Sequence, residues 1–230
     1  MKDKITCFLP CRAGSQRVVK KNTKPIADYR CGLIQIKLCQ LLESEAIDEV
    51  VLSTDDAEIL AYGDSLNEPR LRLHRRIESL SSNITSTDQL VAHVLDLVSE
   101  GHVLWTHVTS PFITAKHYDE IIRTYLEMRG VGYDSLMTTT EIHGFLWMNG
   151  KPINYDRNNE KWPRTQTLDA VHEVNSGAFV APAEVYRELN DRIGRRPYLY
   201  AMDKLEGFDI DWPEDFTIAE CLLKNALVKI

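Results

Sequence analysis

The residues Ile5-Thr-Cys-Phe-Leu-Pro10 form a short apolar run, and the polar, basic stretch Cys11-Arg-Ala-Gly-Ser-Gln-Arg-Val-Val-Lys-Lys-Asn22 follows it at once. A short apolar run that ends in turn-forming residues is typical of a buried strand. The next apolar segment, residues 33–42, has the spacing of a helix. The chain therefore begins with a strand, a loop and a helix, which indicates an α/β fold.

The same alternation continues along the chain. Further strands are expected at residues 49–54, 102–109, 176–181 and 198–202. Further helices are expected at residues 57–62, 86–100, 114–129 and 184–193, and from Pro213 onward. Ser86 and Gln89 have the spacing of a capping box, and Pro213 suits the first turn of a helix. Strands that alternate with helices predict a Rossmann-like, mostly parallel sheet with helices on both faces.

Residues 151–175 interrupt this rhythm because they are polar and contain few apolar positions. A stretch of this length is too long for an ordinary connection between elements. It is either a functional arm or a disordered insert. We expect a single domain over residues 1–230, in which residues 141–180 contain a small protruding arm.

Composition and charge exclude several classes of protein. The 230 residues carry 27 Lys and Arg against 34 Asp and Glu, a net charge of −7, so no diffuse positive field is available for nucleic acid or an anionic membrane. The five cysteines show no paired spacing, and no apolar run is long enough to cross a membrane. We expect a reduced, cytoplasmic protein.

The loop after the first strand is the clearest candidate site for an anion. Its four cations are Arg12, Arg17, Lys20 and Lys21. Gly14 and Ser15 would let backbone N–H groups approach an anion, and cations at the end of a strand supply the charge that a triphosphate requires. A solvated basic turn is the alternative interpretation.

A second candidate site is Phe208-Asp-Ile-Asp-Trp-Pro213. If these residues form a strand, Asp209 and Asp211 point to the same side, where two carboxylates repel unless a cation joins them. Mg²⁺ is the natural candidate, because it binds to one or two carboxylates together with substrate phosphates. The alternative is an exposed pair in which Asp211 caps the helix at Pro213.

Four stretches, in order, resemble the motifs of the acylneuraminate cytidylyltransferases, which make CMP-sialic acid and related CMP-nonulosonates. Pro10-Cys-Arg-Ala-Gly-Ser-Gln-Arg with Lys21-Asn22 resembles the PARxGSKR…KN loop of that family, and Leu52-Ser-Thr-Asp55 resembles its STD turn. His107-Val-Thr-Ser-Pro-Phe112 is similar to its QPTSP segment. Asn175-Ser-Gly-Ala-Phe and Asp209-Ile-Asp211 are similar to its NGA and DID motifs.

The resemblance implies a role for each matching residue. The nucleotide, CTP, would be bound by Arg12, Gly14, Ser15, Arg17, Lys21, Asn22 and Ser82. The acidic sugar would be contacted by His107, Thr109, Ser110, Arg164, Gln166 and Asn175. Mg²⁺ would be held by Asp209 and Asp211, and the catalytic residues would be Asp211, Asp209, Arg12 and Lys21. The family's arm helps to form a homodimer and reaches toward the partner's active site.

Two positions depart from the family pattern. Gln16 stands where the family usually has Lys, and His107 stands where Gln is usual. The reaction expected is the coupling of CTP to an acidic 2-keto-3-deoxy sugar, with release of pyrophosphate. CMP-3-deoxy-manno-octulosonate synthesis is a related alternative, and a nucleotide-binding regulatory or scaffold protein without turnover is an alternative of another class.

Overall fold

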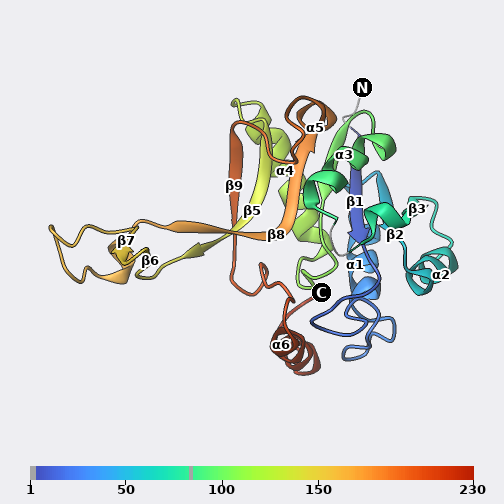
Figure 1. Cartoon of the computed structure of the whole chain (residues 1–230), viewed down its shortest axis with the longest axis horizontal. Coiled ribbons are helices and arrows are strands. Elements are labelled where there is room, and N and C mark those ends of the chain that lie inside the picture. Colours follow the sequence, from blue (N-terminus) through green and yellow to red (C-terminus); the bar gives the residue numbers. More distant parts are fainter. Residues whose placement is uncertain (1–3, 83–84) are drawn as a thin grey trace.

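The computed structural model describes residues 4–82 and 85–230. A seven-stranded sheet with the strand order β3-β2-β1-β4-β8-β5-β9 forms its centre (Figure 1). The strands are β1 (Ile5–Cys11), β2 (Glu49–Thr54), β3 (Leu71–Arg75), β4 (His102–Trp105), β5 (Ser135–Ile142), β8 (Val171–Pro182) and β9 (Pro197–Met202). Every neighbouring pair is parallel except the two that involve β8, which runs antiparallel to both β4 and β5. The predicted mostly parallel sheet is confirmed.

Helices follow most of the strands. They are α1 (Gly32–Glu43), α2 (Ala57–Ser65), α3 (Thr87–Leu97), α4 (Ala115–Arg129), α5 (Ala183–Leu189) and α6 (Pro213–Lys224), with short 3₁₀ turns at η1 (Glu78–Leu80) and η2 (Thr165–Thr167). The Ser86 side chain accepts from the backbone N–H of Gln89, whose own side chain returns the contact, so the predicted capping box is confirmed. In the described part of the chain no helix is long and apolar enough to cross a membrane.

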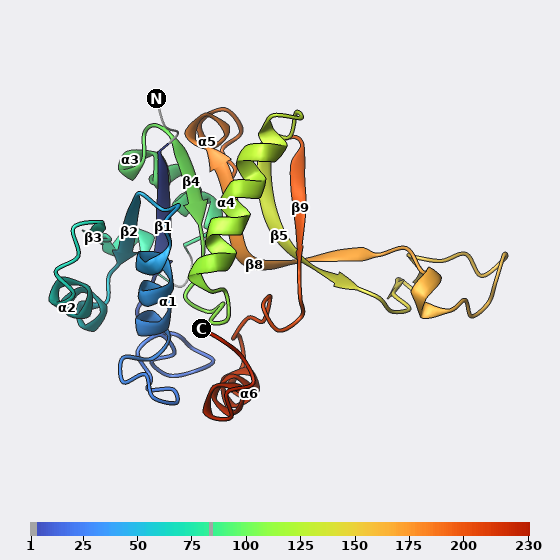
Figure 2. The same ribbon diagram turned by 180° about the vertical axis from the view of Figure 1, so that it is seen from behind.

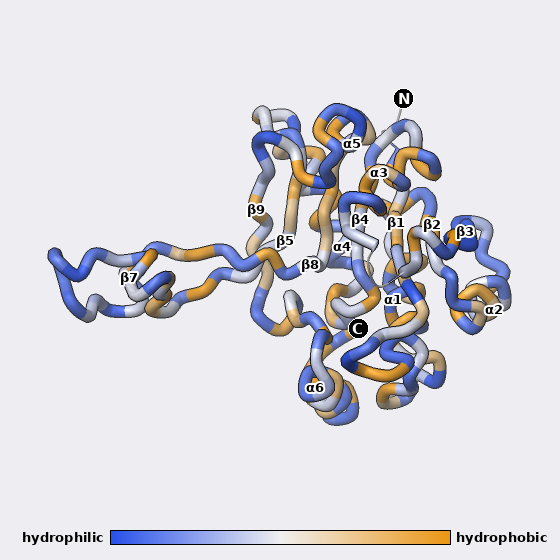
Figure 3. The backbone as a smooth tube through the Cα atoms, viewed as in Figure 1, coloured by the Kyte–Doolittle hydropathy of each residue, from blue (hydrophilic) through white to orange (hydrophobic). Residues whose placement is uncertain are grey.

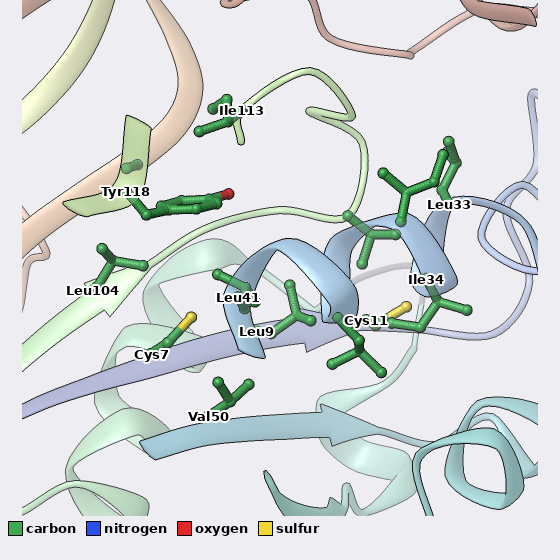
Figure 4. Close-up of a cluster of buried hydrophobic side chains, with 14 of the residues drawn as sticks. Cys7, Leu9, Cys11, Leu33, Ile34, Leu41, Val50, Leu104, Ile113 and Tyr118 are labelled. Carbon is green, nitrogen blue, oxygen red and sulfur yellow. The ribbon is translucent and has the colours of Figure 1, made fainter. Parts of the chain in front are cut away.

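The two faces of the sheet are covered by different helices. Helices α1 and α4 lie on one face (Figure 2), where Cys7 and Leu9 of β1 lie beside Leu41 of α1, and Cys11 lies beside Ile34 (Figure 4). Helices α3 and α5 cover the opposite face. There the rings of Phe8 and Trp105 pack edge to face, with their centres 4.9 Å apart. Because side chains alternate along a strand, the uninterrupted apolar run of β1 supplies both cores.

Two strands and one strand end differ from the sequence expectations. Strands β3 and β5 were not expected, because β3 is an edge strand with only partial burial and β5 is rich in threonine. The strand expected at 102–109 ends at Trp105. At Thr106 the backbone N–H still donates to the Phe8 carbonyl at 3.3 Å, and the side-chain hydroxyl donates to the Gly177 carbonyl at 2.6 Å.

A long arm leaves the sheet between β5 and β8 (Figure 1). The two strands remain paired until Ile142 faces Val171, and the arm follows as residues 143–170. Within it, β6 (Trp147–Met148) pairs with β7 (Lys151–Pro152). The predicted boundaries of 151–175 are therefore wrong, since residues 171–175 belong to β8 and the arm begins earlier.

Internal contacts hold the arm together. The buried Asn154 amide donates to the carbonyls of Gly144 and Asp169 and accepts from the backbone N–H of Leu146. The Phe145 ring lies 5.2 Å from that of Trp162. Figure 3 shows hydrophobic segments along the arm and hydrophilic residues at its far tip. Of the two interpretations, the structure shows a folded arm and not a disordered insert.

Candidate active site

The loop that follows β1 is tied down at both ends. The Ala13 N–H donates to the Asp55 carboxylate at 2.9 Å, and the Asn22 side-chain amide donates to the Arg12 carbonyl at 3.1 Å. Gly14 lies between them with φ +75°, a conformation that other residues rarely adopt, and its surroundings leave open space where a Cβ would stand. The backbone is thus held in a turn that a ligand can approach closely.

This loop forms one wall of a cavity of about 330 Å³. The cavity is lined by Pro10, Cys11, Arg12, Ser15, Gln16, Arg17, Lys21, Asn22, His107, Val108, Thr109 and Asp211. Three of the four loop cations line it, whereas Lys20 turns outward and pairs with Glu58 at 2.6 Å. A cavity rich in guanidinium and ammonium groups favours a phosphate-bearing ligand.

The acidic pair lies at the edge of this cavity, in an irregular segment before α6. The expectation of a strand at 209–211 is wrong, because the segment is held instead by the loop after β4 and by the basic loop. The Ile210 N–H donates to the Thr109 carbonyl at 2.9 Å, and Lys21 Nζ donates to the Ile210 carbonyl at 2.6 Å. Three loops distant in sequence are joined at this point.

The alternative in which Asp211 caps α6 is wrong. The Asp215 carboxylate accepts from the backbone N–H groups of both Asp211 and Trp212, at 3.0 and 2.7 Å. The Asp211 side chain turns to the cations, 3.3 Å from Arg17 and 3.7 Å from Lys21. Because Asp211 is half exposed, these ion pairs contribute little to stability.

Asp209 is more deeply buried than Asp211. Burial raises the pKa of its carboxyl, the nearby Asp211 charge acts in the same direction, and a hydrogen bond from the Thr109 side chain opposes the shift. Its Oδ1 atom is buried without a partner in the described structure. An unpartnered buried oxygen beside a second carboxylate fits a cation that bridges to phosphate oxygens, as Mg²⁺ does. No group of three His, Cys, Asp or Glu able to hold a metal occurs among residues 4–82 and 85–230.

A second, larger cavity of about 830 Å³ adjoins the acidic pair. Its lining is Thr140, Glu141, Ile142, His143, Glu173, Val174, Asn175, Ser176, Lys204, Gly207, Phe208, Asp209 and Asp211. Asn175 is fixed there, since its carbonyl oxygen accepts from the Thr138 hydroxyl at 2.7 Å and its amide donates to Thr140 at 3.1 Å. Asp211 lines both cavities, so the two meet at the acidic pair.

Five predicted site residues line neither cavity, and one of them, Gly14, lies in the basic loop itself. Ser82 lies beside the basic loop, where its carbonyl accepts from Arg12 at 3.3 Å. Ser110 is part of the loop after β4 and is fully buried. Arg164 and Gln166 are exposed and belong to the arm, which projects away from the sheet (Figure 1).

Sequence reasoning missed two cations that support the site, one buried and one partly buried. Lys37 of α1 is fully buried and donates to the Ser110 carbonyl and the Tyr118 hydroxyl, both at 2.7 Å. A lysine inside an apolar helical run could have indicated a buried cation. Arg192, in the turn after α5, donates to His107 Nε2 at 3.2 Å. No local pattern marks Arg192, because its partner is distant in sequence.

The stability of the protein should depend on the titration of Lys37. Burial lowers the pKa of Lys37 from 10.5 to about 7. Between these values the unfolded chain binds more protons than the folded chain, so this group's contribution to the free energy of unfolding rises with pH and is constant below about pH 7. From pH 7 to 9 the wild type should gain about 2 kcal/mol more than Lys37→Met.

Urea unfolding of both proteins at the two pH values measures this difference. Gln40→Met is the matched control, since Gln40 is a buried neutral residue of the same helix that donates to the Pro111 carbonyl. It should keep the wild-type pH dependence. Equal pH dependence in wild type and Lys37→Met would contradict the lowered pKa.

The α/β sheet carries a basic loop after its first strand, and an acidic pair lies where two cavities meet. This arrangement is suited to nucleotidyl transfer. A family model described as cytidylyltransferase matches residues 6–229. The chain therefore belongs to the cytidylyltransferase family and is a nucleotidyltransferase.

Curated relatives carry the same class of name. The chain is 25% identical over 228 residues to an N-acylneuraminate cytidylyltransferase of Escherichia coli, covering 95% of this chain and 52% of that protein. It is 24% identical to a pseudaminic acid cytidylyltransferase of Campylobacter jejuni and 27% identical to a CMP-N,N'-diacetyllegionaminic acid synthase of Legionella pneumophila, with 96% of this chain and 97% of each protein covered. The chain thus spans about half of the Escherichia coli relative and nearly all of the other two.

Solved structures share the fold. A CMP:2-keto-3-deoxy-manno-octonic acid synthetase complexed with CTP superposes with a TM-score of 0.67 at 14% identity, covering 97% of this chain and 99% of that one. A 4-diphosphocytidyl-2C-methyl-D-erythritol synthase superposes with a TM-score of 0.63 at 16% identity, covering 96% of this chain and 100% of that one. The predicted family and fold class are confirmed.

Proposed function

We propose that this protein couples CTP to an acidic 2-keto-3-deoxy sugar of the nonulosonate class and releases pyrophosphate. The anomeric hydroxyl oxygen forms a bond to the α-phosphorus, and the bond from that phosphorus to the bridging oxygen of the leaving pyrophosphate breaks. The names of the curated relatives support the sugar class. The single observation that carries the proposal is that two cavities meet at Asp211.

The division of labour follows from the lining of each cavity. The smaller, basic cavity suits the triphosphate, with Arg12, Arg17 and Lys21 neutralising its charge. The larger cavity suits the sugar, with Asn175 and Lys204 among its polar groups. Bound at Asp209 and Asp211, Mg²⁺ would neutralise phosphate charge and lower the pKa of the attacking hydroxyl. The protein mainly holds the two substrates in line.

The departure at Gln16 falls within the proposed triphosphate cavity. The neighbouring Arg17 also lines this cavity, and its guanidinium lies 3.3 Å from Asp211 and 4.7 Å from the centre of the Trp212 ring. Arg17 is thus close enough to the acidic pair to supply the positive charge that Lys would bring at position 16.

The proposal includes a homodimer in which the arm of one subunit reaches the other. Arg164 and Gln166, the arm residues implied to contact the sugar, belong to residues 143–170, which project away from the sheet of their own chain (Figure 2). The arm also exposes large apolar side chains, including Trp147, Met148 and Trp162. Exposed apolar surface of this kind is typical of an interaction site.

Pyrophosphate release tests the proposed reaction. The purified protein is incubated with CTP, Mg²⁺ and one sugar from a panel of nonulosonic acids that also contains 3-deoxy-manno-octulosonate. Release with a nonulosonic acid supports the proposal, and release with 3-deoxy-manno-octulosonate alone favours the related synthetase. CTP binding without release from any sugar in the panel would favour the non-catalytic alternative.

CTP should be preferred over ATP, GTP and UTP. In the presence of Mg²⁺, a nucleotide at 100 times its Kd stabilises the folded protein by about 2.7 kcal/mol, which is visible as a rise in melting temperature. A thermal shift assay with each nucleotide at the same concentration should show the largest rise with CTP. Equal shifts for all four nucleotides would contradict a cytosine-reading site.

A further inference from the structure

Arg192 is an arginine without a clear structural need for its charge. It follows α5, burial lowers the pKa of its guanidinium, and it makes no ion pair with any residue that the structure describes. The Phe179 ring centre lies 3.7 Å from the guanidinium carbon and the Trp105 ring centre lies 5.0 Å from it. Cation–π contacts with two rings hold the group in place. An apolar residue would fill this space without the cost of burying a charge.

The guanidinium points at one atom of a cavity residue. Arg192 Nη1 lies 3.2 Å from His107 Nε2, and Trp105 Nε1 lies 3.1 Å from the same nitrogen. Arginine and the tryptophan indole are donors only, so both N–H groups are directed at the lone pair of Nε2. The hydrogen of the neutral imidazole must therefore be on Nδ1. In the described structure Nδ1 has no hydrogen-bond partner, and His107 lines the smaller cavity.

The surroundings also keep the ring neutral. Burial lowers the pKa of His107 to about 3, and the charges of Arg192, Lys37 and Lys21 act in the same direction. Protonation would also place a hydrogen on Nε2, facing two donors. His107 thus offers a ligand one hydrogen-bond donor and no acceptor, whereas the glutamine usual at this position offers both.

We infer that Arg192 is a positioning residue, which fixes His107 as a neutral hydrogen-bond donor at the wall of the smaller cavity and so selects an acceptor oxygen on the bound substrate. This inference rests on the proposed function only for the identity of the substrate. A substrate group that presents only a donor to Nδ1 would leave two hydrogens facing each other and be rejected.

The tautomer can be measured without activity. In the holoprotein labelled with ¹⁵N-histidine, the His107 signals are assigned by their loss in His107→Gln. Wild-type His107 should carry its proton on Nδ1 and should not titrate between pH 5 and 8. In Arg192→Met, which keeps an unbranched apolar side chain but removes the donor and the charge, the ring should titrate at higher pH. A wild-type ring protonated on Nε2, or one that titrates near pH 6.5, would overturn the inference.

Kinetics test the consequence for the substrate. Arg192→Met should raise KM for one substrate roughly fivefold with little change in kcat. In this variant kcat/KM should decrease as the pH is lowered below about 6, whereas in the wild type it should not. In a His107→Gln background the same substitution should have no further effect. Arg187→Met is the matched control, because Arg187 of α5 donates to the Ser99 carbonyl and is remote from His107. It should leave KM unchanged.

The outcomes separate this inference from the proposed function. The contrary result is that Arg192→Met reduces kcat/KM equally in the wild-type and His107→Gln backgrounds, with no new decrease at low pH. That result would make Arg192 a purely structural residue. Absence of turnover with every sugar would contradict the proposed function, and the NMR measurement would still decide the tautomer.

Discussion

Replacing Asp211 with asparagine is expected to reduce kcat by on the order of 10²-fold or more while leaving the melting temperature nearly unchanged. Asparagine keeps the shape of the side chain and removes its charge. A carboxylate beside a triphosphate is repelled unless a cation lies between them, so the charge of Asp211 has a use only with Mg²⁺ bound. The fold should survive because the Asp211 side chain is half exposed, so its ion pairs with Arg17 and Lys21 contribute little to stability.

Asp215→Ala is the matched control for this prediction. The Asp215 carboxylate accepts from the backbone at the start of α6, so its removal should lower the free energy of unfolding by about 1 kcal/mol and leave most of the turnover. Melting temperature and Mg²⁺-dependent pyrophosphate release are measured on the same samples. Near-normal turnover in Asp211→Asn would reject a metal-binding role for this carboxylate.

Removing the arm is expected to convert a dimer into a monomer and to abolish sugar binding. Since β5 and β8 are paired up to Ile142 and Val171, the natural design replaces residues 144–169 with Asn-Gly and closes a two-residue hairpin between His143 and Ala170. Both ends of the buried Asn154 network lie within the removed segment. The sheet should therefore fold without it.

Light scattering gives the mass, which should be near twice 26.4 kDa for the whole chain and near the monomer value after the deletion. CTP binding should persist in the shortened protein, because the basic loop lies at the other end of the cavities. The variant Arg164→Ala with Gln166→Ala is a gentler test, expected to keep the dimer and raise KM for the sugar. A wild-type monomer that turns over at micromolar concentration would assign the arm another purpose.

The sequence allowed the main elements to be predicted where a local pattern was strong. The apolar run of β1 and the capping box of α3 were expected at the places where the structure has them. Strands β3 and β5 were missed because partial burial and threonine content hide the signals on which such predictions depend. The arm boundaries were wrong for a related reason, since the polar start of β8 resembles the loop before it.

The candidate site was predictable in its residue types and not in its connections. The basic loop and the acidic pair could be recognised from local composition. In the structure Arg17 Nη1 of the loop lies 3.3 Å from the Asp211 carboxylate. The roles of Lys37 and Arg192 depend on contacts across more than 70 residues of sequence. Such contacts leave no local signature. Ser110 was expected to contact the sugar. It is buried instead, and its carbonyl accepts from the buried Lys37.

The antiparallel β8 has a consequence for synthesis of the chain on the ribosome. Strands β3, β2, β1 and β4 are complete once residue 105 has emerged, but β8, the partner of the free side of β4, begins only at Val171. During this interval the nascent sheet has an open edge whose backbone groups lack their final partner. An unpaired edge of apolar residues is prone to associate with other chains. We expect chains truncated before β8 to aggregate during expression, whereas chains that extend past Met202, where β9 has covered the outer side of β5, should remain in solution.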